Sequence, residues 1–172
     1  MGLFAGVKLA SVAVGGGKAL DFKGEGDFVL EVTEVKGGTT RKKEPYFEVL
    51  HKVVSSTNPE QPVGSMTNLF CMLAGSSSDL GMKNMKEILS VMSGLNPYTA
   101  QGVDEISKIS DEKWVEIAEL ACAEQATFKG TLVNCSVVTT KVKTPKPGGR
   151  TEFFARRYTP NEQTVSQMKG TK

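Results

Sequence analysis

The order in which hydrophobic periods follow one another limits the fold of this chain more than any other feature of its sequence. Apolar residues alternate with polar ones in three early segments, residues 27–36, 45–54 and 65–73, as they do in β-strands with one buried face. Because the turns between them are short, these segments are expected to form an antiparallel meander. Alternation returns in residues 131–143 and 151–158, which a Pro- and Gly-rich loop joins as a hairpin.

The alternation also predicts which strand residues face the core. The expected inward-facing residues are Phe28, Leu30, Val32, Phe47, Val49, Val53, Val133, Cys135 and Val137. Between the first two strands, Gly37 and Gly38 precede a stretch rich in lysine and arginine, and paired glycines are typical of a reversing turn.

The stretch between the third and fourth strands has the period of helices. Apolar residues recur every three or four positions over residues 82–92, and Gly94 stands where such a helix would end. A second helix is expected from about residue 110 to about residue 125, with Trp114 on its buried face. Three strands, two helices and a hairpin follow the order of the OB-fold. The sequence therefore predicts a mainly β fold with a helical insertion: a five-stranded OB-fold Greek-key barrel with two helices between strands three and four. A generic α+β sandwich is the alternative.

The two ends of the 172-residue chain differ from its middle. Residues 25–160 are expected to form the one domain, and the polar tail 161–172 is expected to be mobile. Residues 1–24 are mildly apolar and are expected to be a flexible arm that packs on the domain or on a neighbouring subunit. The glycine run at 15–18 lacks the spacing of a phosphate-binding loop, which favours a flexible hinge.

The net charge is only +2, but the charges are unevenly distributed along the chain. Residues 36–52 hold five basic residues against two acidic ones, and residues 141–158 hold six against one. The helical stretch 79–124 holds nine acidic residues against four basic ones. In an OB-fold, the two basic segments would belong to the loops that flank an oligonucleotide groove.

Aromatic residues stand beside the basic ones. Tyr46 and Phe47 follow the first basic loop, and Phe153, Phe154 and Tyr158 follow the second. Since neighbouring strand residues face opposite sides, one member of each adjacent pair can be exposed and stack on a base. We predict that Tyr46, Phe154 and Tyr158 face outward and that Phe47 and Phe153 face the core.

Several short segments within residues 25–160 are similar to those of a known family. The segments are 26–30 (GDFVL), 46–50 (YFEVL), 128–130 (FKG) and 153–160 (FFARRYTP). Together with the Lys-rich first loop, they resemble bacteriophage OB-fold single-stranded DNA-binding proteins. The resemblance implies that the protein coats transient single strands in replication or recombination, with phosphates held by lysine and arginine. Many such proteins recruit partner enzymes through an acidic tail, whereas Glu162 is the only acid in this tail.

The sequence therefore predicts a non-catalytic protein that binds single-stranded DNA with little sequence preference, and RNA is the alternative ligand. The candidate nucleic-acid-binding residues are Lys36, Arg41, Lys42, Lys43, Tyr46, Lys52, Lys141, Lys143, Lys146, Arg150, Phe154, Arg156, Arg157 and Tyr158. Replication or recombination proteins are further expected partners, and a membrane is not. In the alternative hypothesis, the chain is a structural or adaptor protein that forms homo-oligomers through its N-terminal arm.

Residues for catalysis or metal binding lack the necessary spacing. The only histidine, His51, lies within an apolar strand and is expected to be buried with its hydrogen bonds satisfied. Cys71, Cys122 and Cys135 form no close pair, so neither a zinc site nor a disulfide framework is expected. Carboxylates in the helical stretch leave a magnesium-dependent nuclease open, but nothing selects a pair of them. No cofactor is expected. Free cysteines suit a reducing compartment, so a cytoplasmic location is predicted, in the host cell if a phage encodes the chain.

Overall fold

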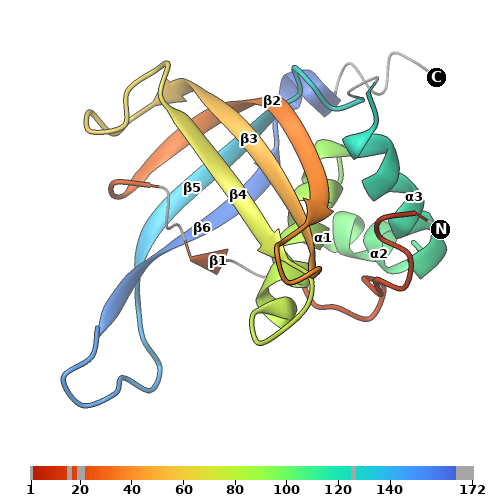
Figure 1. Ribbon diagram of the computed structural model, residues 1–172. Coiled ribbons are helices and arrows are strands. Elements are labelled where there is room, and N and C mark those ends of the chain that lie inside the picture. The colour runs from red at the N-terminus through yellow and green to blue at the C-terminus, as the bar shows by residue number, and fades with distance from the viewer. Residues whose placement is uncertain (1, 15–16, 19–21, 125–126, 166–172) are drawn as a thin grey trace.

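The structure is a computed structural model that describes residues 2–14, 17–18, 22–124 and 127–165. It shows a curved antiparallel sheet with helices along one side, so the chain is mainly β as predicted (Figure 1). Its elements in chain order are β1 (Gly17–Lys18), β2 (Gly26–Thr39), β3 (Pro45–Ser56), β4 (Met66–Met72), α1 (Ser78–Met92), α2 (Ala100–Ser107), α3 (Asp111–Cys122), β5 (Leu132–Lys141) and β6 (Glu152–Pro160).

Within the described residues the sheet has six strands in the order β1-β6-β5-β2-β3-β4. The predicted meander is confirmed as β2, β3 and β4, and the predicted hairpin as β5 and β6. Two parts of the prediction are corrected. The sheet does not close into a barrel, because β4 and β6 are not paired in the described part of the chain and β1 lies along the outer edge of β6. Three helices, rather than two, follow β4 there.

The missed helix, α2, has little hydrophobic pattern to reveal it. Its N-terminus is capped by Thr99, whose hydroxyl accepts the backbone N–H of Gly102 at 3.1 Å. Only Gly102 and Ile106 of this helix are buried, whereas Val103 is exposed. A helix with so short an apolar stripe has no clear period in the sequence.

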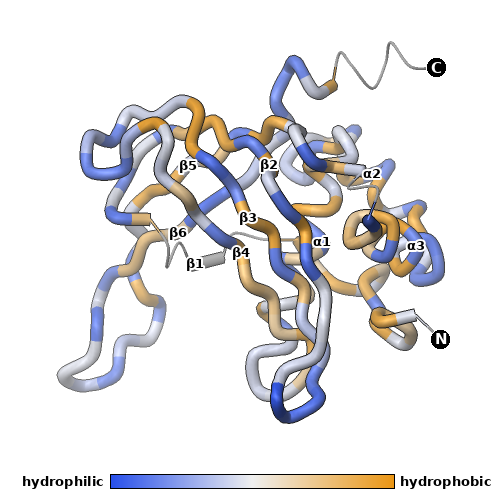
Figure 2. The backbone as a smooth tube through the Cα atoms, turned by 45° about the horizontal axis from the view of Figure 1, so that its top comes forward, coloured by the Kyte–Doolittle hydropathy of each residue, from blue (hydrophilic) through white to orange (hydrophobic). Residues whose placement is uncertain are grey.

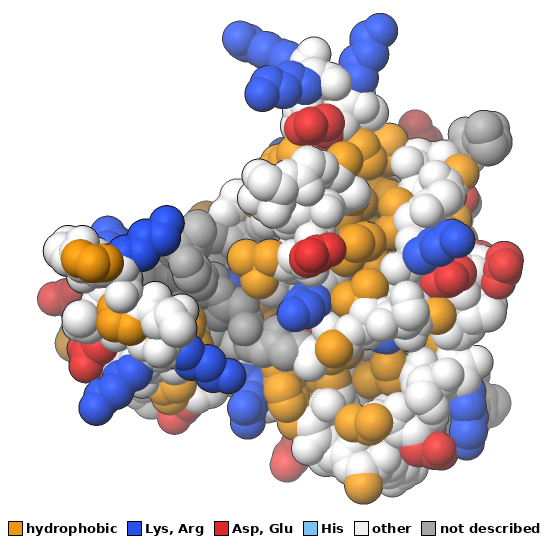
Figure 3. Space-filling model, turned by 90° about the horizontal axis from the view of Figure 1, so that it is seen from below, with side chains coloured by type: hydrophobic (Ala, Val, Ile, Leu, Met, Phe, Trp, Pro, Cys, Tyr) orange, Lys and Arg blue, Asp and Glu red, His pale blue; other side chains and the backbone are white. Residues whose placement is uncertain are grey.

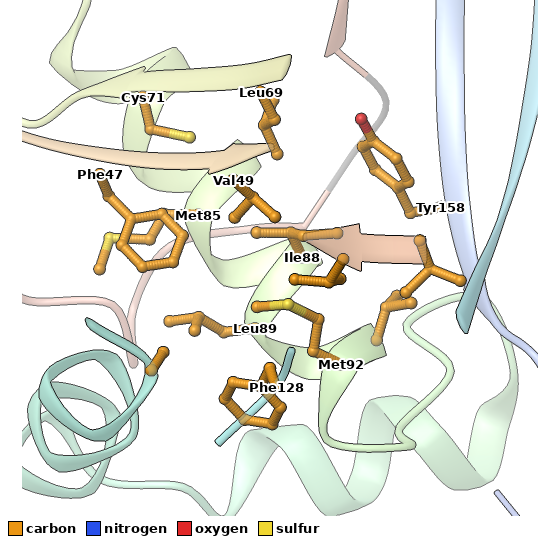
Figure 4. Packing of buried hydrophobic residues seen from close by; sticks show 14 of the residues in the cluster. Phe47, Val49, Leu69, Cys71, Met85, Ile88, Leu89, Met92, Phe128 and Tyr158 are labelled. Atoms are coloured by element: carbon orange, nitrogen blue, oxygen red, sulfur yellow. The ribbon is translucent and has the colours of Figure 1, made fainter. Parts of the chain in front are cut away.

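Helix α1 packs against the inner face of the sheet and fills its open side. It contacts both β4 and β6, the two long strands that fail to pair. At its first turn, a Cβ added to Gly81 would lie 1.7 Å from the carbonyl oxygen of Met72, so helix and strand touch by their backbones. Figure 4 shows the packing side chains of α1, Met85, Ile88, Leu89 and Met92, beside Phe47, Val49 and Leu69 of the sheet.

A buried carboxylate on α1 takes the place of a strand beside β6. Glu87 is fully buried, and its Oε1 accepts the backbone N–H of Tyr158 at 2.9 Å and the hydroxyl of Tyr98 at 2.6 Å. Burial raises the pKa of Glu87, while these hydrogen bonds and the nearby positive charge of Arg156 oppose the rise. A helix side chain thus satisfies a backbone donor that a closed sheet would pair with a strand.

The predicted inward-facing residues of the strands are confirmed. All nine are at most 3% exposed: Phe28, Leu30, Val32, Phe47, Val49, Val53, Val133, Cys135 and Val137. Trp114 is also buried on α3, which begins at the predicted place with Ser110 accepting the N–H of Lys113 at 3.2 Å.

The described part of the N-terminal arm packs on its own domain. Phe4 and Leu9 are 0% and 1% exposed and belong to the main core. Lys86 donates to the carbonyl oxygens of Ala10 at 3.0 Å and Val12 at 2.7 Å. Of the glycine run expected to be a hinge, residues 15–16 lie outside the described residues, and Gly17–Lys18 form β1.

The tail begins with a docked segment rather than a free one. A short helical turn spans residues 162–165. There Thr164 is buried, and its hydroxyl donates to the carbonyl of Leu132 at 2.9 Å and accepts the N–H of the same residue at 3.1 Å. The rest of the predicted mobile tail, residues 166–172, lies outside the described residues.

The contact between Glu87 and β6 predicts a large loss of stability when it is removed. Glu87→Ala should lower the free energy of unfolding by about 3–5 kcal/mol, as is usual when one member of a buried charged network is deleted. Glu116→Ala is the control, because it breaks an exposed ion pair with Lys113 on α3 and should cost less than about 1 kcal/mol. Urea unfolding measures both values. Equal losses of unfolding free energy in the two variants would show that the contact of Glu87 with β6 does not stabilise the sheet.

Candidate nucleic-acid interface

The first basic loop is a tight turn at the end of the β2–β3 hairpin. The N–H of Thr40 donates to the carbonyl of Glu44, and the N–H of Lys43 to the carbonyl of Thr40, both at 2.9 Å. Lys43 has a φ of 62°, which lets the chain reverse within these residues. Arg41, Lys42 and Lys43 are all exposed, so the turn presents three adjacent positive charges to solvent.

The paired glycines before this loop do not form the turn that the sequence predicts. Gly37 and Gly38 lie inside β2, opposite Phe47 and Tyr46 of β3. Neither glycine has a positive φ, so backbone conformation does not explain why these two positions are glycine.

The second basic loop ends the β5–β6 hairpin, which projects away from the helices (Figure 1). The ladder ends with Lys141 opposite Glu152. Beyond it, Lys143, Lys146 and Arg150 are exposed in the loop. Hydrophilic segments occupy both this projection and the tip of the β2–β3 hairpin (Figure 2).

The two basic loops are separate projections that can be seen from one side of the molecule. From below, Lys and Arg side chains gather on the β5–β6 hairpin at the left and on the β2–β3 loop at the top (Figure 3). The surface between the two projections is recessed in this view. The helices, where the acidic residues are concentrated, lie on the side of the molecule opposite the hairpin (Figure 1).

The outer face of β2 and β3 between these loops has mixed charge. Lys36 pairs with Glu48 across the ladder and lies 3.5 Å from Glu34 on its own strand. Lys52 pairs in the same way with Glu31. The two predicted phosphate-binding lysines of this face therefore have carboxylates beside them, as Lys141 has in Glu152.

An aromatic pair lies on the same outer face, close to the first basic loop. Tyr46 faces outward, as predicted, but is half-buried because it stacks on Phe70 of β4, with ring centroids 5.0 Å apart and planes at 23°. Phe70 is 46% exposed. Sequence reasoning missed Phe70, although its position between the buried residues Leu69 and Cys71 of an alternating strand places it outward.

Two predicted site residues on β6 are buried, so their predicted outward orientation is wrong. Tyr158 is 1% exposed and Arg156 is 5% exposed. Their cross-strand partners on β5 are Cys135 and Val137, which face the core, and paired residues of an antiparallel ladder share a face. The Arg156 guanidinium lies 5.2 Å from the centre of the Tyr158 ring. Neither residue is available to a ligand.

The other predicted residues of β6 are accessible. Arg157 is exposed, and its guanidinium lies 4.3 Å from the centre of the Tyr98 ring. Phe154 is 39% exposed, although it shares a face with buried Arg156, because the hairpin extends beyond the core at this point. Phe153, which was expected in the core, is half-buried.

Candidate metal-binding groups are dispersed in the described part of the chain rather than gathered at a site. In the described part of the chain, no cluster of three His, Cys, Asp or Glu side chains is placed to hold a metal ion. Burial raises the pKa of the Cys71 thiol to about 12 and that of Cys122 to about 11, so both thiols stay protonated near neutral pH.

His51 is fully buried, as predicted, but its hydrogen bonds are not satisfied. Neither ring nitrogen has a hydrogen-bond partner among the described residues, and the ring stacks on Tyr158 at 5.9 Å. Burial, followed by the positive charge of Arg156, lowers the pKa of His51 to about 3. His51 is therefore neutral near pH 7 and is a core residue.

Comparison with known proteins adds no identification. The chain matches no family model and no curated protein. None of the helices in the described ranges is long and apolar enough to cross a membrane.

The buried neutral His51 predicts a specific sensitivity to acid. The unfolded side chain titrates near 6.5 and the folded one near 3, so the unfolded state binds an extra proton between these values. The stability that depends on neutral His51 is present above pH 6.5 and is lost as the pH falls toward 3. When the pH is lowered from ~7 to ~4, the free energy of unfolding should therefore fall less in His51→Leu than in the unmodified protein.

Urea unfolding at several pH values measures this difference. Val49→Ala is the control, because it destabilises the same core without removing a titratable group. It should keep the pH dependence of the unmodified protein. The same acid sensitivity in His51→Leu as in the unmodified protein would contradict the prediction.

Proposed function

We propose that this protein binds single-stranded DNA with little sequence preference. The observation that carries the proposal is the pair of exposed basic loops, about a hundred residues apart in sequence, which project from the sheet and are seen together from one side of the molecule (Figure 3). Nucleic-acid backbones are recognised mainly by such lysines and arginines.

The strand arrangement supports an OB-type binding site. The β2–β3–β4 meander is extended on its other side by β5 and β6, and helices connect β4 to β5. In an OB-fold, the loops that correspond to β2–β3 and β5–β6 flank the oligonucleotide groove. Here α1 and β1 take the positions at which the strands of a closed barrel would meet. A role in phage replication or recombination is proposed on the sequence resemblance alone.

The proposed site is narrower than the set predicted from sequence. Its phosphate-binding residues are the exposed basic residues of the two loops: Arg41, Lys42, Lys43, Lys141, Lys143, Lys146 and Arg150. Bases stack on Phe70 and Phe154, with Tyr46 supporting Phe70 from behind. Arg157 is exposed on β6 beside Tyr98, while the buried residues Arg156 and Tyr158 are excluded from the proposed site.

Exposed aromatic rings favour single strands over duplex. A base can stack on a side chain only if it is unstacked from its neighbours, which costs less in a single strand than in a duplex. Stacking does not read the 2′-hydroxyl, so RNA remains the alternative ligand. The adaptor hypothesis receives no support from the described part of the arm, since Phe4 and Leu9 are buried in the same chain.

The basic loops predict a strong dependence of binding on salt. The slope of log K against log salt concentration should be roughly −5, at about −0.7 for each of the phosphates contacted by the loop residues. Replacing Arg41, Lys42 and Lys43 by alanine should make the slope shallower by about 2. Fluorescence anisotropy of labelled oligo-dT at several salt concentrations measures both slopes.

A matched control removes the same charge from the helical part of the chain. Lys83, Lys108 and Lys113 are exposed on α1, after α2 and on α3. Replacing these three by alanine should leave the slope unchanged. A flat salt dependence of the unmodified protein, or equal effects of the two triple variants, would overturn the proposed interface.

The outward Phe70 predicts a loss of affinity that does not depend on charge. Phe70→Ala should weaken oligo-dT binding by about 1–3 kcal/mol, the usual contribution of one stacked base, without changing the salt slope. Met66→Ala is the control, since Met66 lies on the same face of the same strand and is 53% exposed but has no ring. Comparison of oligo-dT, oligo-rU and duplex with both variants measures the effect. Equal losses in the two variants would exclude stacking on Phe70.

A further inference from the structure

Two adjacent glycines near the end of β2 each have an aromatic ring in the space where a side chain would lie. A Cβ added to Gly37 would lie 2.7 Å from Cζ of Phe4 and 2.6 Å from Cδ2 of Leu3. A Cβ added to Gly38 would lie 2.9 Å from the hydroxyl oxygen of Tyr46. All three distances are shorter than van der Waals contact. The glycines therefore give room for rings on both faces of the strand.

Gly37 and Gly38 lie near the end of the β2–β3 ladder, just before the basic loop. Gly37 pairs with Phe47 and Gly38 with Tyr46, and only the pair after them separates these rungs from the turn at residues 40–44. On the inner face, Phe4 packs edge-on against Phe47, with ring centroids 5.9 Å apart and planes at 67°. Phe4 covers this end of the hairpin from inside, while Tyr46 covers it from outside.

The segment that carries Phe4 is fixed to two helices. Lys86 of α1 donates to the carbonyls of Ala10 and Val12, and Asp111 of α3 accepts the N–H of Ala10 at 2.7 Å. Lys86 is only 4% exposed, and its charge is therefore directed at these carbonyls rather than at solvent. The anchored segment holds Phe4 in place against the hairpin.

We propose that residues 2–14 position the basic β2–β3 loop and that Phe4 is the positioning residue. This inference rests on the proposed function, in which Arg41, Lys42 and Lys43 of that loop bind phosphates. The N-terminal segment touches no ligand itself. It limits the directions in which the hairpin end can bend, so the three charges stay oriented toward a bound strand.

The first test needs no DNA and compares two buried residues of the same segment. Phe4→Ala removes the ring against the hairpin, whereas Leu9→Ala removes an equally buried side chain next to Ala10. Amide hydrogen exchange of Thr40 and Lys43, whose N–H groups close the turn, should become about tenfold faster in Phe4→Ala than in Leu9→Ala, which corresponds to about 1.4 kcal/mol. Phe4→Leu, which keeps a buried apolar group, gives a second variant in case Phe4→Ala folds poorly, and should show a smaller increase.

The second test asks whether Phe4 acts through the loop charges. Phe4→Ala should weaken binding of labelled oligo-dT about tenfold in the otherwise unmodified protein. In the variant with alanine at Arg41, Lys42 and Lys43, the same change should have no further effect, because residues that act through one another are not additive. Leu9→Ala, which leaves the Phe4 ring against the hairpin, should weaken binding less than Phe4→Ala does in the otherwise unmodified protein.

The outcomes separate this inference from the proposed function. Equal exchange rates in Phe4→Ala and Leu9→Ala, or an undiminished loss of affinity in the triple-alanine background, would overturn the positioning role. Absence of oligo-dT binding by the unmodified protein would overturn the proposed function, and the exchange rates would still decide whether Phe4 positions the loop.

Discussion

The contact between Glu87 and β6 is the interaction on which the rest of the structure depends. A curved sheet whose end strands do not pair leaves backbone donors that must be satisfied, and α1 meets that need with a buried carboxylate that accepts from Tyr158 and Tyr98. The same contact explains two features of the core that are unusual for a β fold. Helix α1 is buried from residue 84 to residue 92, because it lies between the sheet and the other helices. Arg156 is tolerated in the core because Tyr158 and Glu87 lie close to its guanidinium.

Filling the open side of the sheet with helices also separates the charges. The acidic residues of α2 and α3 lie beyond α1, on the side away from the β5–β6 hairpin. The basic residues are concentrated in the loops, where few carboxylates compete with a bound phosphate. A net charge of +2 therefore conceals acidic helices and basic loops, and the positive loops would attract a polyanion.

Features that depend on the local hydrophobic period could be predicted from the sequence. Features that depend on a residue far away in the chain could not. Alternation located Phe47 and Val49 in the core because each strand has one apolar face. The same reasoning failed on β6, whose inner face includes Arg156, because alternation does not show that Tyr158 and Glu87, the latter some seventy residues earlier, lie close to that side chain in the core. Gly37 and Gly38 were assigned to a turn by composition, but their neighbours Phe4 and Tyr46 determine their role. In the candidate site, the charged loops were predictable from composition and position. Strand alternation also predicts the exposure of Phe70, although Phe70 is not among the predicted site residues.

The distribution of charge on the sheet indicates how a single strand would lie in the proposed complex. Glu31, Glu34 and Glu48 lie beside Lys36 and Lys52 on the outer face of β2 and β3, so the centre of that face has no excess of positive charge to hold phosphates. Phe70 presents an apolar surface on the same face, beside Tyr46 and close to the first basic loop. A strand held by phosphates at the two loops would therefore turn its bases toward the sheet and its backbone away from it. In the proposed complex this orientation would leave the Watson–Crick edges without dedicated donors or acceptors from the loops, as binding without sequence preference requires.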